Sequence, residues 1–490
     1  MRTSQPGQPG GPVSWYWLGD RGPTSLLAKK RSSPLRETPM TETLIVLIIF
    51  SALFLVLLFT QFRLSGMIVL LVCLRPFVEA AHGITLAAFY GYDVNPMSLW
   101  AVAVIVMSLA YWVINKKNPL EYKVSKILLL FLVSVVLGSI LTLHHGAIIE
   151  HLFKYLPWLL LIPVVADITK DMEADRFFHF VFIALSLLLL INLVLLMTRR
   201  YDAAYYGVGE FYGYFKNPHV FSYTMLFLSF FALWKVYTEK RKIFPLMVLT
   251  ACLGFVTFAY VRATWLAFLV GLATYLVAER QSSRKYLAAV LLSLFLVVFI
   301  YHFRSMLIPA FQERNMDFQQ ALLLGERGHL GSGRIAFWGI QLKGYLNSSP
   351  LELVFGKGFR YISVLTAREY GMEIGGHNDY IELLLGSGLV GLVCFILFQG
   401  YLFKKALYVH RKVDPLMGLL GILLMAILVT LGFTSGVIYM QSNIYNAVLL
   451  GTVVGLAERH ERRTPAEKTL HHNVGYLSSI SPHPISGQRA

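Results

Sequence analysis

The stretch GGHNDYIELLLGSGLVG, residues 375–391, changes from polar to apolar within a few residues. It opens with two glycines and His377, and from Leu383 it continues as an apolar run that ends near Lys404. An apolar run of about 18 or more residues predicts a transmembrane helix. The sequence therefore places a histidine where a membrane helix meets water.

The composition indicates a membrane protein. Of the 490 residues, 56% are hydrophobic and 14% are charged, whereas soluble domains average about 25% charged residues. Apolar runs of spanning length recur from Leu44 to Ala457, so we expect an all-α polytopic fold. The predicted spans are 44–61, 66–83, 97–114, 124–143, 147–166, 177–197, 219–237, 243–260, 263–278, 286–303, 383–403, 415–433 and 441–457.

The net charge of +16 suggests nucleic acid as a partner, but the positions of the cations argue against it. Lys and Arg gather in short segments between predicted spans, which is typical of cytoplasmic loops. These segments are 116–126, 240–242, 280–285, 404–412 and 459–463. We therefore expect a lipid bilayer and no nucleic acid as partner, with segment 304–376 on the outer side. The three cysteines lie in apolar runs and predict neither disulfides nor a metal cluster.

The span count leaves one conflict, because an odd number of crossings puts a basic N-terminus outside. We favour twelve crossings, in which the run 66–83 does not cross fully; thirteen crossings with an external N-terminus is the alternative. The expected organisation is a disordered tail over 1–40, transmembrane helices over 41–303, a large external loop over 304–376, C-terminal transmembrane helices over 377–457 and a disordered cytoplasmic tail over 458–490.

The external loop 304–376 is too long for a connector and too aromatic for a disordered linker. Residues 335–346 carry apolar side chains at helical spacing, which is suited to lying along a membrane surface. Residues 353–359 are typical of a glycine-rich turn. We expect a partly helical, ordered lid over the outer face.

Three side chains on the predicted outer side could carry chemistry. His377, beside Asn378, could act as a base or a hydrogen-bond donor near neutral pH, although a lone histidine is more often an ordinary hydrogen-bonded residue. Arg262 begins a span, where simple snorkelling is the alternative, and Arg334 opens the amphipathic segment, where loop solubility is the alternative. Two guanidinium groups suit phosphate oxygens because their geometry permits bidentate bonding. Together these residues predict a diphosphate site.

Other residues of the same face are weaker candidates. Lys216 could add positive charge to this face or merely hold the membrane interface. Gly386, Gly388 and Gly391 permit close approach of another helix or of a lipid chain. The sequence contains no Asp-x-Asp pattern, so we expect a site without a metal and without a cofactor.

The histidine and the glycines also form a known pattern. His377-Asn378, nine residues, then Gly388-Leu389-Val390-Gly391 resembles the His-[Asn/Ser/Gln]-x9-Gly-x-x-Gly motif of bacterial O-antigen ligases. The related O-antigen and exopolysaccharide polymerases share the region less strictly. The resemblance covers roughly residues 200–440 in detail, and its flanking features are Arg262 after a span, Ser332-Gly333-Arg334 with Trp338, and Gly356-Lys357-Gly358.

The resemblance implies a GT-C-like glycosyltransferase in the bacterial inner membrane, with its active site facing the periplasm. Such enzymes transfer a glycan from undecaprenyl diphosphate to an acceptor hydroxyl without metal or nucleotide sugar. Carried onto this sequence, Arg262 and Arg334 neutralise the diphosphate, His377 orients or deprotonates the acceptor hydroxyl, and Asn378 helps to place it. Lys216 and the motif glycines are then further candidates for substrate binding.

Two questions stay open at this point. The acceptor is a lipid A core sugar for a ligase and another lipid-linked repeat for a polymerase. A transporter or flippase for a lipid-linked oligosaccharide would share the spans and the anionic-lipid site. It would, however, place ionisable residues near the bilayer midplane on broken helices, whereas the candidates here lie at the outer ends.

Overall fold

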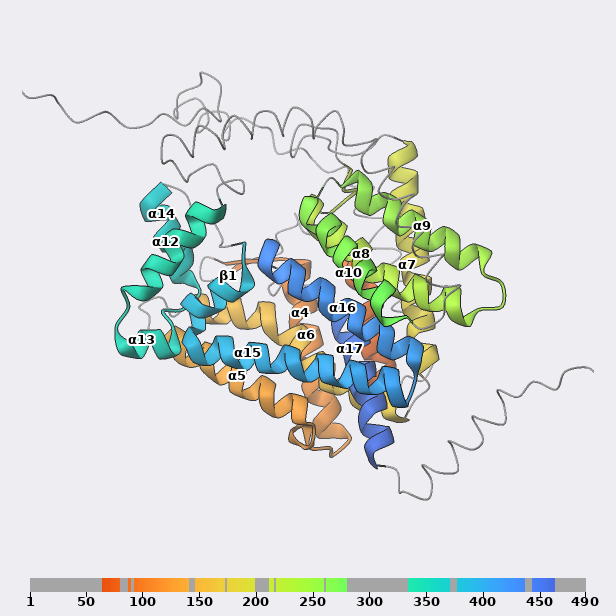
Figure 1. Cartoon of the computed structure of the whole chain (residues 1–490), viewed down its shortest axis with the longest axis horizontal. Coiled ribbons are helices and arrows are strands. Elements are labelled where there is room, and N and C mark those ends of the chain that lie inside the picture. The colour runs from red at the N-terminus through yellow and green to blue at the C-terminus, as the bar shows by residue number, and fades with distance from the viewer. Residues whose placement is uncertain are drawn as a thin grey trace, which may run out of the picture. The chain divides into compact units, whose positions relative to one another are not determined.

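The computed structural model describes residues 64–79, 87–89, 92–140, 146–171, 174–198, 211–215, 217–259, 261–279, 334–370, 377–436 and 443–462. Within these ranges the chain is built almost entirely of helices (Figure 1). They are α3 (Leu64–Glu79), α4 (Pro96–Ile114), the short 3₁₀ helix η1 (Pro119–Glu121), α5 (Lys123–Ile140), α6 (Gly146–Asp171), α7 (Ala174–Met197), α8 (Pro218–Thr238), α9 (Ile243–Phe258), α10 (Arg262–Ala278), α12 (Arg334–Leu346), α13 (Pro350–Phe355), α14 (Arg360–Tyr370), α15 (Asp379–Lys412), α16 (Pro415–Thr434) and α17 (Asn443–Arg462).

The predicted spans coincide with helices wherever the two can be compared. Five described helices, α4, α7, α8, α15 and α16, are long and apolar enough to cross a membrane. Large apolar side chains on their outer surfaces, such as Val106, Leu193 and Leu397, are about half exposed, as expected where the surrounding solvent is lipid. The protein is therefore a multi-pass helical membrane protein. The runs 44–61 and 286–303 and both predicted tails lie outside the described residues, so the number of crossings stays a prediction.

The helical architecture that the sequence predicts is confirmed in the described residues, and one short hairpin is added to it. Strands β1 (Ala87–Phe89) and β2 (Tyr92–Val94) pair antiparallel between α3 and α4, with Ala88 opposite Asp93. Backbone that leaves a helix needs new partners, from the protein or from water, for its N–H and C=O groups. Two three-residue strands provide such partners for each other, and they are too short to give a readable alternation in the sequence.

Helix α15 lies beside α5 and α16 (Figure 1). Gly138 near the end of α5 approaches the main chain of Gly386 near the start of α15. Two turns earlier on α5, the ring of Phe131 lies 5.9 Å from that of Phe395, which is further along α15. The two helices are therefore antiparallel, and the end of α5 lies at the same end of the bundle as the start of α15.

Helices α6 and α17 pack along their length and run parallel. A Cβ on Gly451 would lie 2.7 Å from the carbonyl oxygen of Ile162, and one on Gly455 would lie 2.4 Å from that of Ala166. Glycine at these positions lets the two backbones approach closely, as small residues do between membrane helices.

A buried carboxylate joins three helices where α5 begins and α15 finishes, which we call the basic end. Asp167 on α6 is 2% exposed and accepts hydrogen bonds from Lys117 Nζ (2.6 Å), from the Tyr111 hydroxyl (2.7 Å) and from the Tyr122 hydroxyl. These partners come from α4 and from the segment between α4 and α5. The network therefore fixes how α4, α5 and α6 meet.

We expect Asp167→Ala to lower the free energy of unfolding by about 3–5 kcal/mol, the range for removing one partner from a buried charge network. The substitution leaves an ammonium and two tyrosine hydroxyls without their shared acceptor. Thermal unfolding in detergent measures the effect. Glu461→Ala is the control, because its ion pair with Lys405 is 44% exposed on the glutamate side and should contribute at most about 1 kcal/mol. An unchanged unfolding midpoint for Asp167→Ala would contradict the interpretation.

Residues 334–370 fold into α12, α13 and α14, which pack on the N-terminal half of α15 (Figure 1). The predicted helicity of the long loop is confirmed for these residues; 304–333 and 371–376 lie outside the described part of the chain. Helix α13 begins with a capping box, in which Ser349 N–H donates to the Glu352 carboxylate (2.8 Å) and Glu352 N–H to the Ser349 hydroxyl. Burial raises the pKa of Glu352, but the hydrogen bonds from Ser349 outweigh it and hold that pKa below its ordinary value.

Candidate active site

Helix α15 begins at a polar junction with a strained residue. The side-chain oxygen of Asn378 accepts hydrogen bonds from the main-chain N–H groups of Tyr380 (3.0 Å) and Ile381 (3.2 Å), which satisfies donors that a helix start leaves unpaired. The preceding residue, His377, has a φ of +52°, an uncommon left-handed conformation for a residue with a side chain. Such a conformation costs on the order of 1–3 kcal/mol and persists only where neighbours impose it.

Two carboxylates in the first turn of α15 are buried beside this histidine. Asp379 is 1% exposed and Glu382 is 5% exposed. Oxygen Oε1 of Glu382 accepts the main-chain N–H of His377 at 3.0 Å, and negative charge is favourable at the N-terminal end of a helix. Neither residue is among the site residues predicted from the sequence. The signal that could have found them is an acidic pair placed just after an asparagine N-cap.

The end of α16 closes against this junction. The amide nitrogen of Asn378 donates to the Phe433 carbonyl at 3.3 Å, and the ring of Tyr380 lies 4.3 Å from that of Phe433. Gly436 has a φ of +72°, and a Cβ there would lie 3.7 Å from the Cα of His377. The main chain at the histidine is thus held from two sides, by its own helix and by α16.

The motif glycines create a break in α15 that another segment fills. Gly388 has φ +67° and ψ −169° inside the helix, and a break of this kind deprives carbonyls one turn earlier of their helical N–H partners. The Lys357 N–H donates to the Leu385 carbonyl (2.8 Å), and the Gly358 N–H donates to the Gly386 carbonyl (2.9 Å). The turn after α13 therefore supplies the hydrogen bonds that α15 has lost.

The fit between the turn and the broken helix is tight. A Cβ on Gly388 would lie 2.3 Å from the carbonyl oxygen of Val354, and one on Gly356 would lie 2.5 Å from the main chain of Gly386. A Cβ on Gly391 would collide with the side chain of Ser387, one turn earlier on α15, and would lie close to that of Ser134 on α5. The predicted close approach at these glycines is confirmed. The approaching atoms belong to the protein itself, and a substrate-binding role for Gly388 and Gly391 stays a prediction.

Arg262 is the first residue of α10 and its side chain is exposed. The residue before it, Val261, offers no side-chain cap to the helix. Helix α9 ends only three residues before Val261, so the two helices run in opposite directions. The 16 residues of α9 span about 24 Å, which separates Arg262 from the basic segment 240–242.

A series of contacts puts Arg262 at the same end of the bundle as the start of α15. The loop before α8 donates a main-chain hydrogen bond to the carbonyl of Phe258, at the end of α9. At the other end of α10, the Tyr275 hydroxyl is hydrogen-bonded to that of Tyr237 near the end of α8. Trp234 on α8 packs on Phe178 near the start of α7, the helix that follows α6 at the basic end. The C-terminal end of α10 therefore lies at the basic end, and Arg262 lies at the opposite end.

The other two predicted cations are described only in part or not at all. Arg334 is the first residue of α12, a helix that contacts α15; its side chain lies outside the described atoms. Lys216 lies outside the described residues altogether. The convergence of both arginines on His377 therefore stays a prediction.

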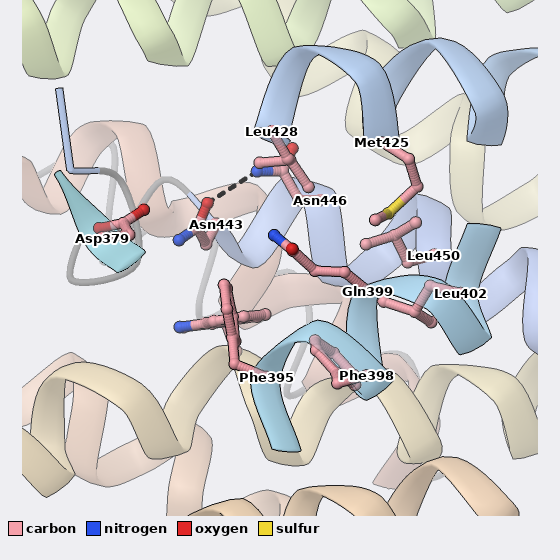
Figure 2. Close-up of a pocket in the computed structure, with 11 residues that line it drawn as sticks. Asp379, Phe395, Phe398, Gln399, Leu402, Met425, Leu428, Asn443, Asn446 and Leu450 are labelled. Atoms are coloured by element: carbon pink, nitrogen blue, oxygen red, sulfur yellow. Dashed lines mark hydrogen bonds between the residues drawn. The ribbon is translucent and has the colours of Figure 1, made fainter. Parts of the chain in front are cut away.

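A small cavity with four polar side chains in a mostly apolar lining lies among α6, α15, α16 and α17. Figure 2 shows Asp379, Gln399, Asn443 and Asn446 around it, with the Asn446 amide donating to the Asn443 side-chain oxygen at 2.8 Å. The remaining walls are aromatic and aliphatic. Its volume of about 30 Å³ has room for about two water molecules. The cavity is too small for a sugar ring, so it suits hydration of buried polar groups next to the start of α15.

Metal binding finds no support in the described part of the chain. No three His, Cys, Asp or Glu side chains gather there as ligands. Metal-free chemistry itself stays a prediction.

The comparison with protein families points to the same segment. A family model described as O-Antigen ligase matches residues 246–396, from within α9 to within α15. This range contains Arg262, Arg334, His377 and both motif glycines, whereas Lys216 precedes it. No curated protein sequence matches the chain. Residues 246–396 of the chain are therefore similar to the O-antigen ligase family.

Proposed function

We propose that this protein is a membrane glycosyltransferase. It takes a glycan from undecaprenyl diphosphate and joins it to an acceptor hydroxyl, on a lipid A core sugar or a growing polysaccharide, at the periplasmic face of the bacterial inner membrane. The observation that carries the proposal is that the family match contains the strained, half-buried His377 at the end of a multi-pass bundle. Strain held by surrounding structure is typical of functional sites.

The chemistry assigns a different task to each cation. Charge develops on the diphosphate as the glycosidic bond breaks, so Arg262 and Arg334 would act where oriented cations contribute most. His377 would accept the proton of the attacking hydroxyl or orient that hydroxyl, and Asn378 would keep the histidine at the helix start. Lys216 would add positive charge near the leaving group. No metal or nucleotide sugar takes part in this scheme.

The transporter alternative draws on the break in α15, because broken helices often line transport sites. Here the freed carbonyls of Leu385 and Gly386 accept hydrogen bonds from the turn after α13. Main chain of the same protein therefore fills the break in α15. These contacts favour a scaffold for a fixed site over a moving gate.

The proposed activity can be tested with purified protein in lipid nanodiscs. The assay supplies a glycan on undecaprenyl diphosphate together with a panel of acceptors. We expect release of undecaprenyl diphosphate and a matching gain in acceptor mass, and the acceptor that reacts separates ligase from polymerase. Translocation of intact donor across sealed vesicles, without cleavage in the nanodisc assay, would establish the transporter instead.

The arginine variants give a prediction of their own. Arg262→Ala should lower kcat by about 10²–10³-fold, the usual loss when one oriented group that stabilises developing charge is removed, whereas Arg334→Ala should mainly raise the donor concentration required. Initial rates at varied donor and acceptor concentrations distinguish these effects. Arg241→Ala, an exposed arginine at the other end of α9, is the matched control. If Arg334→Ala changes only the KM for the acceptor, the residue binds the other substrate.

A further inference from the structure

The strongest unassigned feature of the site is the ring of hydrogen bonds between residues 377 and 382. Glu382 accepts the main-chain N–H of His377 through Oε1 (3.0 Å). Its own main-chain N–H donates to the carbonyl of Asn378 (3.0 Å). The side-chain bond therefore reaches back past the N-cap and holds the residue just before the helix.

The bond matters because His377 has a conformation that residues with a side chain adopt only rarely. At φ +52° the direction of its Cα–Cβ bond differs from that of an ordinary extended or helical residue. The direction of the imidazole is thus decided by the main chain, and a main-chain change would move the ring as a whole. Contact with the end of α16 at Gly436 limits the space on one side, and Glu382 fixes the N–H on the other.

The chain offers a direct comparison for this bond. Glu352 on α13 also accepts a main-chain N–H near its helix start, from Ser349 at 2.8 Å. That bond lies at an exposed surface, whereas Glu382 is 5% exposed. Burying a carboxylate costs free energy, so buried carboxylates are normally paired or hydrogen-bonded. An ordinary helix start, like that of α13, needs no burial of its glutamate.

We propose that Glu382 is a positioning residue for His377: its carboxylate locks the histidine main chain in the left-handed conformation that aims the imidazole at the acceptor hydroxyl. The inference rests on the proposed glycosyl transfer for its kinetic consequence. Its structural part, the lock on the main chain, does not depend on that activity. What the bond requires is an oxygen acceptor at this position, and a glutamine side chain provides one.

The test compares Glu382→Ala, Glu382→Gln and Glu352→Ala in the full-length protein in nanodiscs. Residue-resolved hydrogen–deuterium exchange reports the bond directly. We expect faster exchange of the His377 amide in Glu382→Ala, slow exchange retained in Glu382→Gln, and no change at His377 in Glu352→Ala. Equal His377 exchange in wild type and Glu382→Ala would overturn the lock, whatever the protein catalyses.

Kinetics then test the consequence of the lock. Glu382→Ala should lower kcat by about 10²-fold, as for a reacting group misplaced by about 1 Å, with little change in the KM for the donor. Glu382→Gln should keep most of the wild-type kcat, and Glu352→Ala should match wild type. An equal loss of kcat in Glu382→Gln and Glu382→Ala would mean that the negative charge of Glu382 is needed, and not its hydrogen-bond acceptor. That result would overturn the proposal. Absence of transfer by the wild type instead refutes the proposed function, while the exchange experiment still decides whether Glu382 holds His377.

Discussion

His377→Ala is expected to lower glycan transfer by about 10²–10⁴-fold, the usual contribution of a positioned acid or base, while membrane insertion and yield stay at wild-type levels. The alanine keeps the main-chain N–H that Glu382 accepts, so the helix start should persist. The loss should appear in kcat, because the imidazole acts on the attacking hydroxyl. Product formation is measured by chromatography of the lengthened acceptor.

Two further variants separate chemistry from folding at this position. His377→Asn retains a residue that tolerates a positive φ but removes the imidazole, and it should be as inactive as the alanine variant. His179→Ala, an exposed histidine on α7 at the basic end, should transfer glycan normally. Normal transfer by either variant at position 377 would remove the histidine from the mechanism.

The second large effect is expected for Gly388→Ala, which should destabilise the protein strongly. With φ +67° and ψ −169° the residue occupies a region that is essentially limited to glycine, where a side chain costs about 1–3 kcal/mol. The added Cβ would also lie 2.3 Å from the main-chain oxygen of Val354, and overpacking of this kind costs a further amount of about 1–3 kcal/mol. Thermal unfolding in detergent should show a clearly lowered midpoint, together with loss of transfer.

The same helix provides a matched control for this prediction. Gly400 lies in the later half of α15, and a Cβ there would have no heavy atom within 4 Å. Gly400→Ala should leave stability unchanged or raise it, since alanine is the better helix former by about 1 kcal/mol. If the two variants unfold at the same temperature, Gly388 is not required for the break in α15 or for its close contact with Val354.

The sequence was sufficient for most helices because their boundaries are marked locally. The predicted run 219–237 coincides with α8, which starts at Pro218 behind an Asn217 cap, and the run 415–433 coincides with α16, which starts at Pro415 behind an Asp414 cap. Proline at the first helical position and an asparagine or aspartate before it are strong start signals. The length of the apolar runs predicted the remaining helices.

The features that sequence reasoning missed depend on contacts between distant segments or on backbone angles. The sequence marked Gly388 as a place of close approach, but it could not say that the turn after α13 would occupy it. Nothing in the sequence distinguishes Glu382 from other acidic residues, because its role depends on the left-handed main chain at His377. The hairpin β1–β2 was missed because six residues carry too little pattern.

The insertion of the turn after α13 into α15 has a consequence for exchanging parts between related proteins. The Leu385 and Gly386 carbonyls take their hydrogen bonds from the turn after α13, so a foreign loop grafted onto this bundle would leave these buried carbonyls without donors. Chimeras should therefore swap residues 350–391 as one block, carrying loop and helix together. Recombination points between these two elements should yield proteins that unfold at a lower temperature than the block exchange.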